Sequence, residues 1–521
     1  MSQRHSTPIR GLMATGRSPL FQGRFGRLFR SLPPATFGAT DTDNVNNLTK
    51  LAKAMTAKFD PPTDGKDPEE SGIPALYTYL GQFIDHDLTF DPASSLQMRD
   101  DPDALTDFRT PAFDLDNIYG RGPDDQPYMY DSTGMSFLLG KPLTGGAPNA
   151  TDLPRNSATP ARALIGDPRN DENMIVSQLQ GLFHRFHNQT VKANPGKTFE
   201  QIQRLVRFHY QYVILNDFLP RIIQADVLAA LKDEKGQFEQ KKLKLFHWKN
   251  EPFMPIEFSV ACYRLGHSMI RPGYRINDGK LNLLPIFMTS EASKDFKDDL
   301  QGFREIPSDR AIDWGRFIDI DVRAYDGDDD AKKKRLQFAY RLDTSLVDPL
   351  SNLPIPAVVS TPPPSLAQRN LERGWRLGLP SAQHVAEAMG LKPLDDKQIL
   401  IGKGVDQQDP EDPPVRTIDE VDPIFTNNCP LWTYVLAEAM HKQASVKIPV
   451  KENVSLTTPQ LGAVGGRIVA EVFLGLMFGD NHSLVSSQPN WKPAQTPYAL
   501  KDFVNFALGK KADVMAIPAA S

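Results

Sequence analysis

The sequence predicts a mainly α-helical protein with few short strands, built as one large domain behind an irregular N-terminal arm. Apolar residues recur at helical spacing in several segments, whereas strand-like alternation is weak and rare. Pro-rich stretches at 360–364 and 409–414 interrupt the second half, but side chains suited to one chemistry lie on both sides of the first stretch. We therefore interpret both stretches as surface loops, residues 71–521 as a single domain and residues 1–70 as the arm.

The clearest helical pattern lies between Met174 and Ala193. Ile175, Leu179, Leu182 and Phe186 recur there at the spacing of one apolar helix face. Similar apolar stripes predict further helices over 199–215, 385–389, 431–440 and 465–478.

Composition excludes several classes of protein. The 521 residues are 40% hydrophobic and 24% charged, and the net charge of −5 with a pI near 6.1 gives no general attraction to nucleic acid. Two cysteines, Cys262 and Cys429, exclude a disulfide framework and a cysteine-rich metal site. No apolar run is long enough to span a membrane, and the arginine-rich N-terminus lacks the apolar core of a signal peptide. The compartment and the oligomeric state stay open.

The most informative segment is Gly81–Pro92, which combines an amide, carboxylates and an imidazole with apolar residues. On a helix Gln82, Asp85 and His86 stand at i, i+3 and i+4 and share one face, while Asp87 is rotated by about 100°. We expect the first face to do chemistry and Asp87 to bind a cation.

A second acidic segment supplies partners for Asp87. Thr110, Asp114 and Asp116 offer oxygen atoms, and the carbonyl of Ala112 adds another. Such an oxygen cage suits Ca²⁺ better than zinc or copper. An acidic turn without a metal is the alternative for this spacing.

Three further pairs of residues stand three positions apart. Arg169 and Glu172 precede the predicted helix at 174, where a capping box with a surface arginine is the alternative interpretation. Arg264 and His267 lie in an apolar segment, so His267 is either a metal ligand or a core histidine. In the third pair, Asn370 and Arg373, an amide and a guanidinium offer a hydrogen bond to a metal-bound histidine and an anion partner. His184 and His187 are also three apart, but we assign them to helix packing.

In order, spacing and residue type, these motifs resemble the animal-type haem peroxidases of the peroxidase-cyclooxygenase superfamily, over roughly residues 75–480. The resemblance implies a single helical peroxidase domain that contains haem b and Ca²⁺. It also implies hydrogen peroxide as oxidant and a halide, thiocyanate or small phenol as electron donor.

The resemblance also implies a role for each motif residue. His86 would be the distal histidine, with Gln82 beside it and Arg169 as the distal arginine. His267 would be the iron ligand and Asn370 the acceptor of its ring N–H. The remaining matches are the ester-forming carboxylates Asp85 and Glu172, the propionate partners Arg264 and Arg373, and the calcium loop of Asp87, Thr110, Ala112, Asp114 and Asp116.

Departures from the family pattern narrow these expectations. Asn173 stands where one branch of the family has a methionine bonded to haem, so that bond is absent. Asp116 replaces a serine of mammalian members and adds negative charge to the calcium loop. A haem fatty-acid dioxygenase is the alternative enzyme, but Arg264 occupies the position of its radical-forming tyrosine, and Tyr263 is one residue out of register. A non-catalytic, calcium-stabilised binding protein is the third possibility, which the presence of His86 and His267 disfavours.

Overall fold

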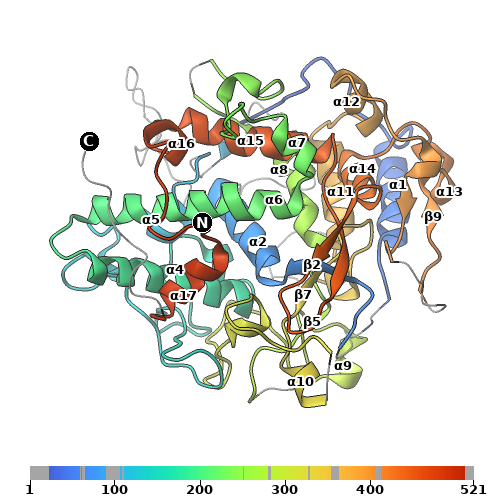
Figure 1. Cartoon of the computed structure of the whole chain (residues 1–521). Coiled ribbons are helices and arrows are strands. Elements are labelled where there is room, and N and C mark those ends of the chain that lie inside the picture. The colour runs from blue at the N-terminus through green and yellow to red at the C-terminus, as the bar shows by residue number, and fades with distance from the viewer. Residues whose placement is uncertain are drawn as a thin grey trace.

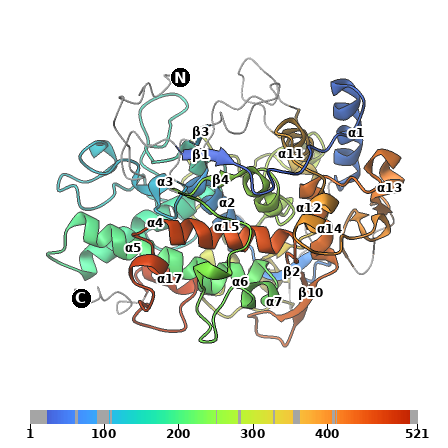
Figure 2. The same ribbon diagram turned by 90° about the horizontal axis from the view of Figure 1, so that it is seen from above.

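The computed structural model of the chain shows a mainly helical protein (Figures 1 and 2). It describes residues 23–58, 60, 65–89, 106–107, 111–249, 251–279, 283–326, 329–353, 363–405, 408, 410 and 412–510. Of the two Pro-rich stretches that we interpret as loops, residues 360–362, 409 and 411 lie outside the described ranges, and residues 363–364, 410 and 412–414 are in neither a helix nor a strand. None of the helices in the described ranges is long and apolar enough to cross a membrane.

The predicted helices are present. The helix over 174–193 and that over 431–440 have the predicted ends, and the helix from 199 gives way to a π-helical turn at Ile214–Phe218. The α-helices are α1 Asp41–Ala54, α2 Leu76–Leu88, α3 Asp116–Tyr119, α4 Met174–Ala193, α5 Phe199–Val213, α6 Leu219–Ile222, α7 Ala225–Ala229, α8 Ile256–Ser259, α9 Ala292–Asp295, α10 Asp329–Lys333, α11 Leu366–Arg376, α12 Ala382–Ala388, α13 Ile418–Val421, α14 Leu431–Met440, α15 Gly465–Gly479, α16 Leu484–Ser487 and α17 Leu500–Ala507.

The strands are short, as expected, and they form small separate sheets. β3, β1 and β4 lie side by side in that order, and the other strands form the antiparallel pairs β2–β7, β5–β6, β8–β9 and β10–β11. The strands are β1 Gly23–Gly26, β2 Glu70–Pro74, β3 Thr106–Asp107, β4 Met254–Pro255, β5 Gly273–Tyr274, β6 Leu284–Pro285, β7 Phe338–Tyr340, β8 Leu400–Ile401, β9 Arg416–Thr417, β10 Gln443–Lys447 and β11 Ser455–Pro459.

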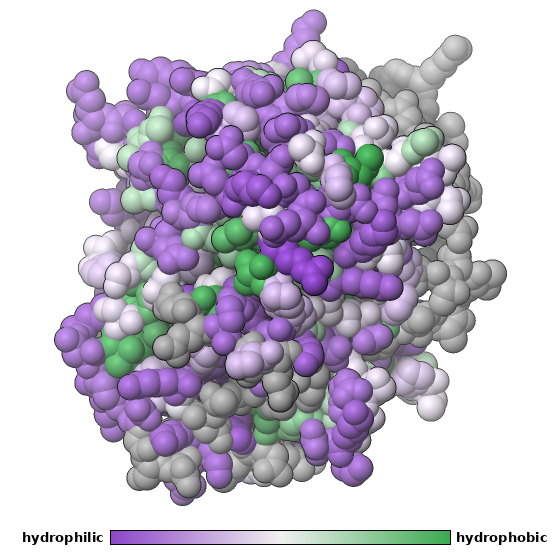
Figure 3. Space-filling model, turned by 90° about the vertical axis from the view of Figure 1, so that its right-hand side faces the viewer, coloured by the Kyte–Doolittle hydropathy of each residue, from purple (hydrophilic) through white to green (hydrophobic). Residues whose placement is uncertain are grey.

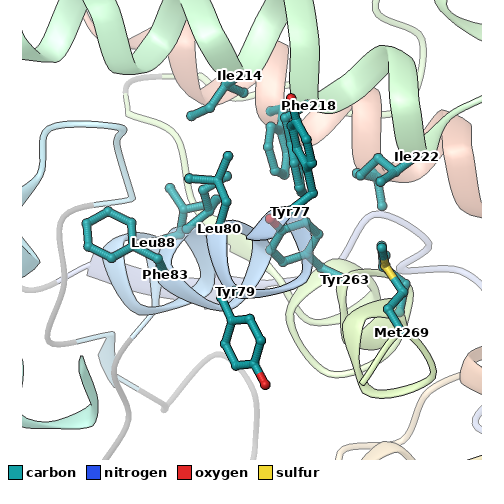
Figure 4. Packing of buried hydrophobic residues seen from close by; sticks show 14 of the residues in the cluster. Tyr77, Tyr79, Leu80, Phe83, Leu88, Ile214, Phe218, Ile222, Tyr263 and Met269 are labelled. Carbon is teal, nitrogen blue, oxygen red and sulfur yellow. The ribbon is translucent and has the colours of Figure 1, made fainter. Parts of the chain in front are cut away.

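Helix α2 lies in the middle of the molecule. Helices α4, α5 and α17 lie on one side of it, α1, α11 and α14 lie on the other, and α15 crosses above (Figures 1 and 2). Leu80 on α2 faces Ile214 and Phe218 of the segment after α5, while Tyr79 points away from them (Figure 4). Leu80 and Ile214 are fully buried. This packing fixes the rotation of α2 and therefore the direction of its polar side chains.

The N-terminal segment differs from the expected irregular arm in the part that the structure describes. Helix α1 begins with a capping box in which Thr40 Oγ1 accepts from the Asp43 N–H, and it buries Leu48 and Leu51. Prolines and glycines around it concealed this local signal. The division of the chain at residue 70 stays a prediction.

Residues before α1 connect the N-terminal segment to later elements through hydrogen bonds. Arg27 donates to the carbonyl oxygens of Leu377 and Gly378 over 2.6 and 2.8 Å. The N–H groups of Leu28 and Phe29 both donate to Glu257 Oε1 over 3.1 Å. Gly378 has φ +65°, and a Cβ there would lie 3.2 Å from Arg27, so glycine suits both the backbone and the contact.

The face in Figure 3 is mainly hydrophilic, with small separate apolar patches. Such scattered patches are normal for a surface in contact with water.

Candidate functional site

The face of α2 that carries Gln82, Asp85 and His86 meets two other segments, the 3₁₀ turns Pro168–Asp171 and Cys262–His267. His86 is 5% exposed, and its Nδ1 lies 2.7 Å from Oδ1 of Asn170. Burial, aided by Arg169, lowers the pKa of His86 to about 4. The imidazole is therefore neutral near pH 7. Since an amide oxygen can only accept, Nδ1 carries the ring proton and Nε2 is bare.

Arg169 joins this turn to the end of α2. Its Nη2 donates to the carbonyl oxygens of His86, over 3.1 Å, and of Thr89. Its Nε and Nη2 also donate to the fully buried carboxylate of Asp167, over 3.2 and 2.8 Å. Asp167 in addition accepts from the Arg169 N–H and so caps the turn. These contacts fix the guanidinium close to His86.

Arg264 and His267 lie on the second turn. In a 3₁₀ helix residues three apart are eclipsed, so the two side chains project in the same direction. Arg264 Nη1 lies 3.0 Å from Asp85 Oδ2 and joins this turn to α2. Burial by itself would raise the pKa of Asp85, but Arg264 and Arg169 outweigh it, so the pKa is lower than usual. Asp85 is therefore a buried, ionised carboxylate beside both histidines.

His267 makes its own amide contact, with Asn370 of α11. The two atoms are Nδ1 of His267 and Nδ2 of Asn370, 2.8 Å apart, so the amide presents its nitrogen and not the predicted oxygen. Removal from water, with Arg264 adding, lowers the pKa of His267 to about 3. Arg373 lies one turn after Asn370 on α11 and is half-buried.

Glu172 closes the site on the side of Gln82. Gln82 Nε2 donates to Glu172 Oε1, and Asn173 Nδ2 donates to Gln82 Oε1 over 3.3 Å. Burial is the main reason why the pKa of Glu172 is raised to about 7. Asn173 also caps α4, because its Oδ1 accepts from the N–H groups of Ile175 and Val176.

Another face of α2 carries Asp87, as the helical spacing predicts. One carboxylate oxygen each of Asp87, Asp114 and Asp116 lie within 4.8 Å of one another. Burial and the two neighbouring carboxylates raise the pKa of Asp87 well above its usual range. Its Oδ2 accepts from Tyr210 over 3.1 Å, but the buried Oδ1 has no hydrogen bond in the described part of the chain. Ala112, two residues before Asp114, is buried, and Thr110 lies outside the described residues.

Sequence reasoning missed two side chains of this site, Asn170 and Asp167. Both stand within two residues of Arg169, in a segment where nearly every residue is polar. The density of polar residues was the available signal, but nothing in the sequence alone distinguishes those that turn inward.

The fold is similar to those of solved peroxidase and dioxygenase structures. The structure is similar to peroxidase A from Dictyostelium discoideum, with a TM-score of 0.51, 13% identity and coverage of 91% of this chain and 90% of that one. It is also similar to the fatty acid alpha-dioxygenase of Arabidopsis thaliana, with a TM-score of 0.54, 13% identity and coverage of 94% and 80%. At such identities the likeness shows the fold alone.

The sequence comparisons point to the same family as the motifs. Residues 97–304 match the family model named animal haem peroxidase, which confirms the resemblance to that family over this part of the chain. A peroxidase-like protein from Margaritifera margaritifera is 25% identical over 41% of this chain and 26% of its own length. Thyroid peroxidase from Canis lupus familiaris is 22% identical over 38% of this chain and 22% of its own length. The chain thus aligns with about a quarter of these relatives.

Proposed function

We propose that the protein is a haem peroxidase that reduces hydrogen peroxide and oxidises a halide, thiocyanate or a small phenol. The observation that carries the proposal is the pair of neutral imidazoles, His86 and His267, which both lie beside the Asp85–Arg264 ion pair. Each imidazole has its Nδ1 in contact with an asparagine, so that in the observed arrangement Nε2 is bare on His86 and carries the ring proton on His267.

The donor set fits a haem. His267 would hold the iron through Nε2, which requires the amide of Asn370 to turn over so that its oxygen accepts from Nδ1–H. Arg264 and Arg373 would pair with the propionates. When bound, haem supplies the redox chemistry, while the chain supplies position and charge.

His86 is suited to move a proton between the two oxygens of hydrogen peroxide. Its bare Nε2 would take the proton of the inner oxygen and return it to the outer oxygen, which leaves as water. Arg169 would favour the negative charge on the departing oxygen, which is worth a few kcal/mol for a fixed donor. Asp167 and the carbonyls of His86 and Thr89 hold that guanidinium in place.

Two finer features belong to the proposal. Asp85 and Glu172 would form esters with the haem after exposure to peroxide, and acid-acetone extraction that then removes all the haem would contradict this.

Asp87, Asp114 and Asp116, with Thr110 and the Ala112 carbonyl, would bind Ca²⁺. The unsatisfied Oδ1 of Asp87 and the mutual repulsion of the three carboxylates support a cation there.

The test is an absorption spectrum of the purified protein, followed by peroxide titration with bromide, iodide, thiocyanate and a phenol in parallel. We expect a haem Soret band and peroxide consumption that depends on one of these donors. A protein without bound haem would contradict the proposal and favour the non-catalytic alternative.

A further arm of the same experiment measures oxygen uptake with linoleate and no peroxide. Uptake would favour the dioxygenase alternative, which shares the fold. Against that alternative, Arg264 pairs with Asp85, and the hydroxyl of Tyr263 donates to the Gly81 carbonyl over 3.3 Å.

A further inference from the structure

A chain of buried hydrogen bonds continues from His86 into the protein, away from the face that we assign to chemistry. Asn170 accepts from His86 over 2.7 Å and donates from Nδ2 to Gln180 Oε1 over 2.8 Å. Gln180 Nε2 lies 3.0 Å from Nε2 of His184. The exposed fractions of these side chains are 5% for His86, 0% for Asn170 and Gln180, and 1% for His184. Water therefore does not compete for these links.

The elements that carry the chain hold it in alignment. Gln180 and His184 stand four apart on α4 and share a face of that helix. The ring of His184 stacks on Phe137, with centroids 4.3 Å apart and planes 8° apart. Next to Asn170, Asp171 accepts from both terminal nitrogens of Arg155 over 2.7 and 2.8 Å, which anchors the turn. Both ends of the chain are thus fixed by packing and ion pairing.

The series of hydrogen bonds has a direction, because each amide offers a donor on one side and an acceptor on the other. In the observed arrangement Gln180 donates to His184, Asn170 donates to Gln180, and His86 must donate to Asn170. His86 then carries its proton on Nδ1, and so does His184. The reverse arrangement turns both amides over and moves both ring protons to Nε2. Intermediate arrangements would place two donors or two acceptors face to face, which is unfavourable in a dry interior.

We propose that Gln180 and His184 are positioning residues that fix the ring tautomer of His86 through Asn170. In the observed direction Nε2 of His86 is bare and can accept a proton, whereas in the reverse direction it would carry one. The unsatisfied polar atom lies at the far end, where Nδ1 of His184 is buried without a hydrogen-bond partner among the described residues. The importance of the tautomer for catalysis rests on the proposed peroxidase function, but the tautomer itself does not.

The test reads the ring nitrogens of the full chain without haem, by long-range ¹H–¹⁵N correlation spectra of protein labelled with ¹⁵N-histidine. A His86→Gln variant and a His184→Gln variant assign the two signals. In the wild-type protein we expect both histidines to carry the proton on Nδ1. A proton on Nε2 of His86 would overturn the proposal.

Two substitutions of Gln180 separate direction from packing. Gln180→Leu interrupts the series of hydrogen bonds, so the signal of His86 should become a mixture of tautomers. Gln180→Glu accepts on both sides, so His86 should keep its proton on Nδ1 while that of His184 moves to Nε2. An unchanged His184 in Gln180→Glu would overturn the proposal even if Gln180→Leu failed to fold. His187→Gln is the matched control: this histidine is buried on the same helix but bonds Tyr119, and His86 should not respond.

Haem-loaded protein gives a second measurement. Gln180→Leu should lower the rate constant for peroxide in proportion to the fraction of His86 that carries its proton on Nε2, because a base in the wrong tautomer cannot accept the proton, and Gln180→Glu should retain the wild-type rate constant. Equal losses in both variants would contradict the proposal. If the wild-type chain never binds haem, the proposed function fails, while the tautomers in the haem-free chain still decide this inference.

Discussion

The two histidines of the site make the same contact with opposite atoms. His86 meets the oxygen of Asn170 over 2.7 Å, and His267 meets the nitrogen of Asn370 over 2.8 Å. On the His86 side the amide is held from behind by Gln180. On the His267 side Asn370 forms part of the wall of a cavity that is otherwise lined by apolar side chains such as Leu371, Trp375 and Trp432.

This difference shows that an asparagine beside a histidine does not by itself define what the imidazole can do. The atom that the amide presents decides which ring nitrogen is bare, and that atom is chosen by the surroundings of the amide. On the His86 side the observed orientation of the amide already leaves Nε2 bare. On the His267 side the amide would have to turn over before a metal could bind Nε2.

The strongest way to break the comparison is to remove each imidazole in turn. His86→Leu should retain haem but lower the rate constant for peroxide by about 10²–10⁴-fold, because the proton-transfer group is lost. His267→Leu should instead prevent stable haem binding. Stopped-flow absorbance and haem content distinguish the two, with the exposed His384→Leu as control. Retention of haem by His267→Leu would contradict the assignment of His267 as the iron ligand and of His86 as the proton-transfer group.

The second substitution concerns the acidic cluster of Asp87, Asp114 and Asp116, on another face of α2 from His86. Saturating Ca²⁺ at about 100 times its dissociation constant should stabilise the protein by about 2.7 kcal/mol. Asp114→Asn should abolish most of this gain, since one ligand and one repelling charge are removed together. Thermal unfolding with and without a chelator measures it, and the exposed Asp124→Asn is the matched control. A gain that persists in Asp114→Asn would place the cation elsewhere.

Substitution of Asn370 sharpens the contrast between the two amides. Asn370→Leu should weaken haem binding by about 10- to 100-fold, because the ligand loses the partner that orients it. Asn370→Asp should keep the affinity, since a carboxylate can accept from Nδ1 but cannot donate. Titration of the haem-free protein, followed by the Soret band, gives both affinities. Equal affinity in the leucine variant would show that this amide plays no part.

The smallest expected effect concerns acid. Burial lowers the pKa of His184 to about 3 and that of His187 to about 4, so both are neutral in the folded chain. In the unfolded chain they take up protons below about pH 6.5, so the free energy of unfolding falls as the pH drops from there towards the folded pKa values. Each contributes up to about 1.4 kcal/mol per pH unit. Urea unfolding between pH 5 and 7 should show a shallower dependence in His187→Gln, and an unchanged slope would contradict this.

The sequence predicted the fold and the motif positions well, for reasons that are visible in particular elements. Periodicity alone located α4 and α14 to the residue, because apolar side chains recur along the whole length of each helix. Helical spacing also separated His86 from Asp87 on α2. What periodicity could not show is α1, whose capping box stands in a segment rich in proline and glycine.

The details of the site that escaped prediction are all consequences of folding. Asn170 and Gln180 have no motif of their own, and they acquire a role only when η3 (Pro168–Asp171) turns back over α4. The pairing of Arg264 with Asp85 joins residues 179 positions apart. Such contacts depend on how segments meet, which short-range patterns do not contain.

The hydrogen bonds that residues before α1 make with later elements have a practical consequence for shortened versions of this protein. Glu257 is fully buried and accepts from the backbone of Leu28 and Phe29, and it belongs to the helix that immediately precedes the turn with His267. A version trimmed to begin at residue 71 would leave that carboxylate without these two backbone donors. Expression boundaries drawn from the motifs alone would therefore discard a piece of the scaffold that supports His267, the proposed iron ligand.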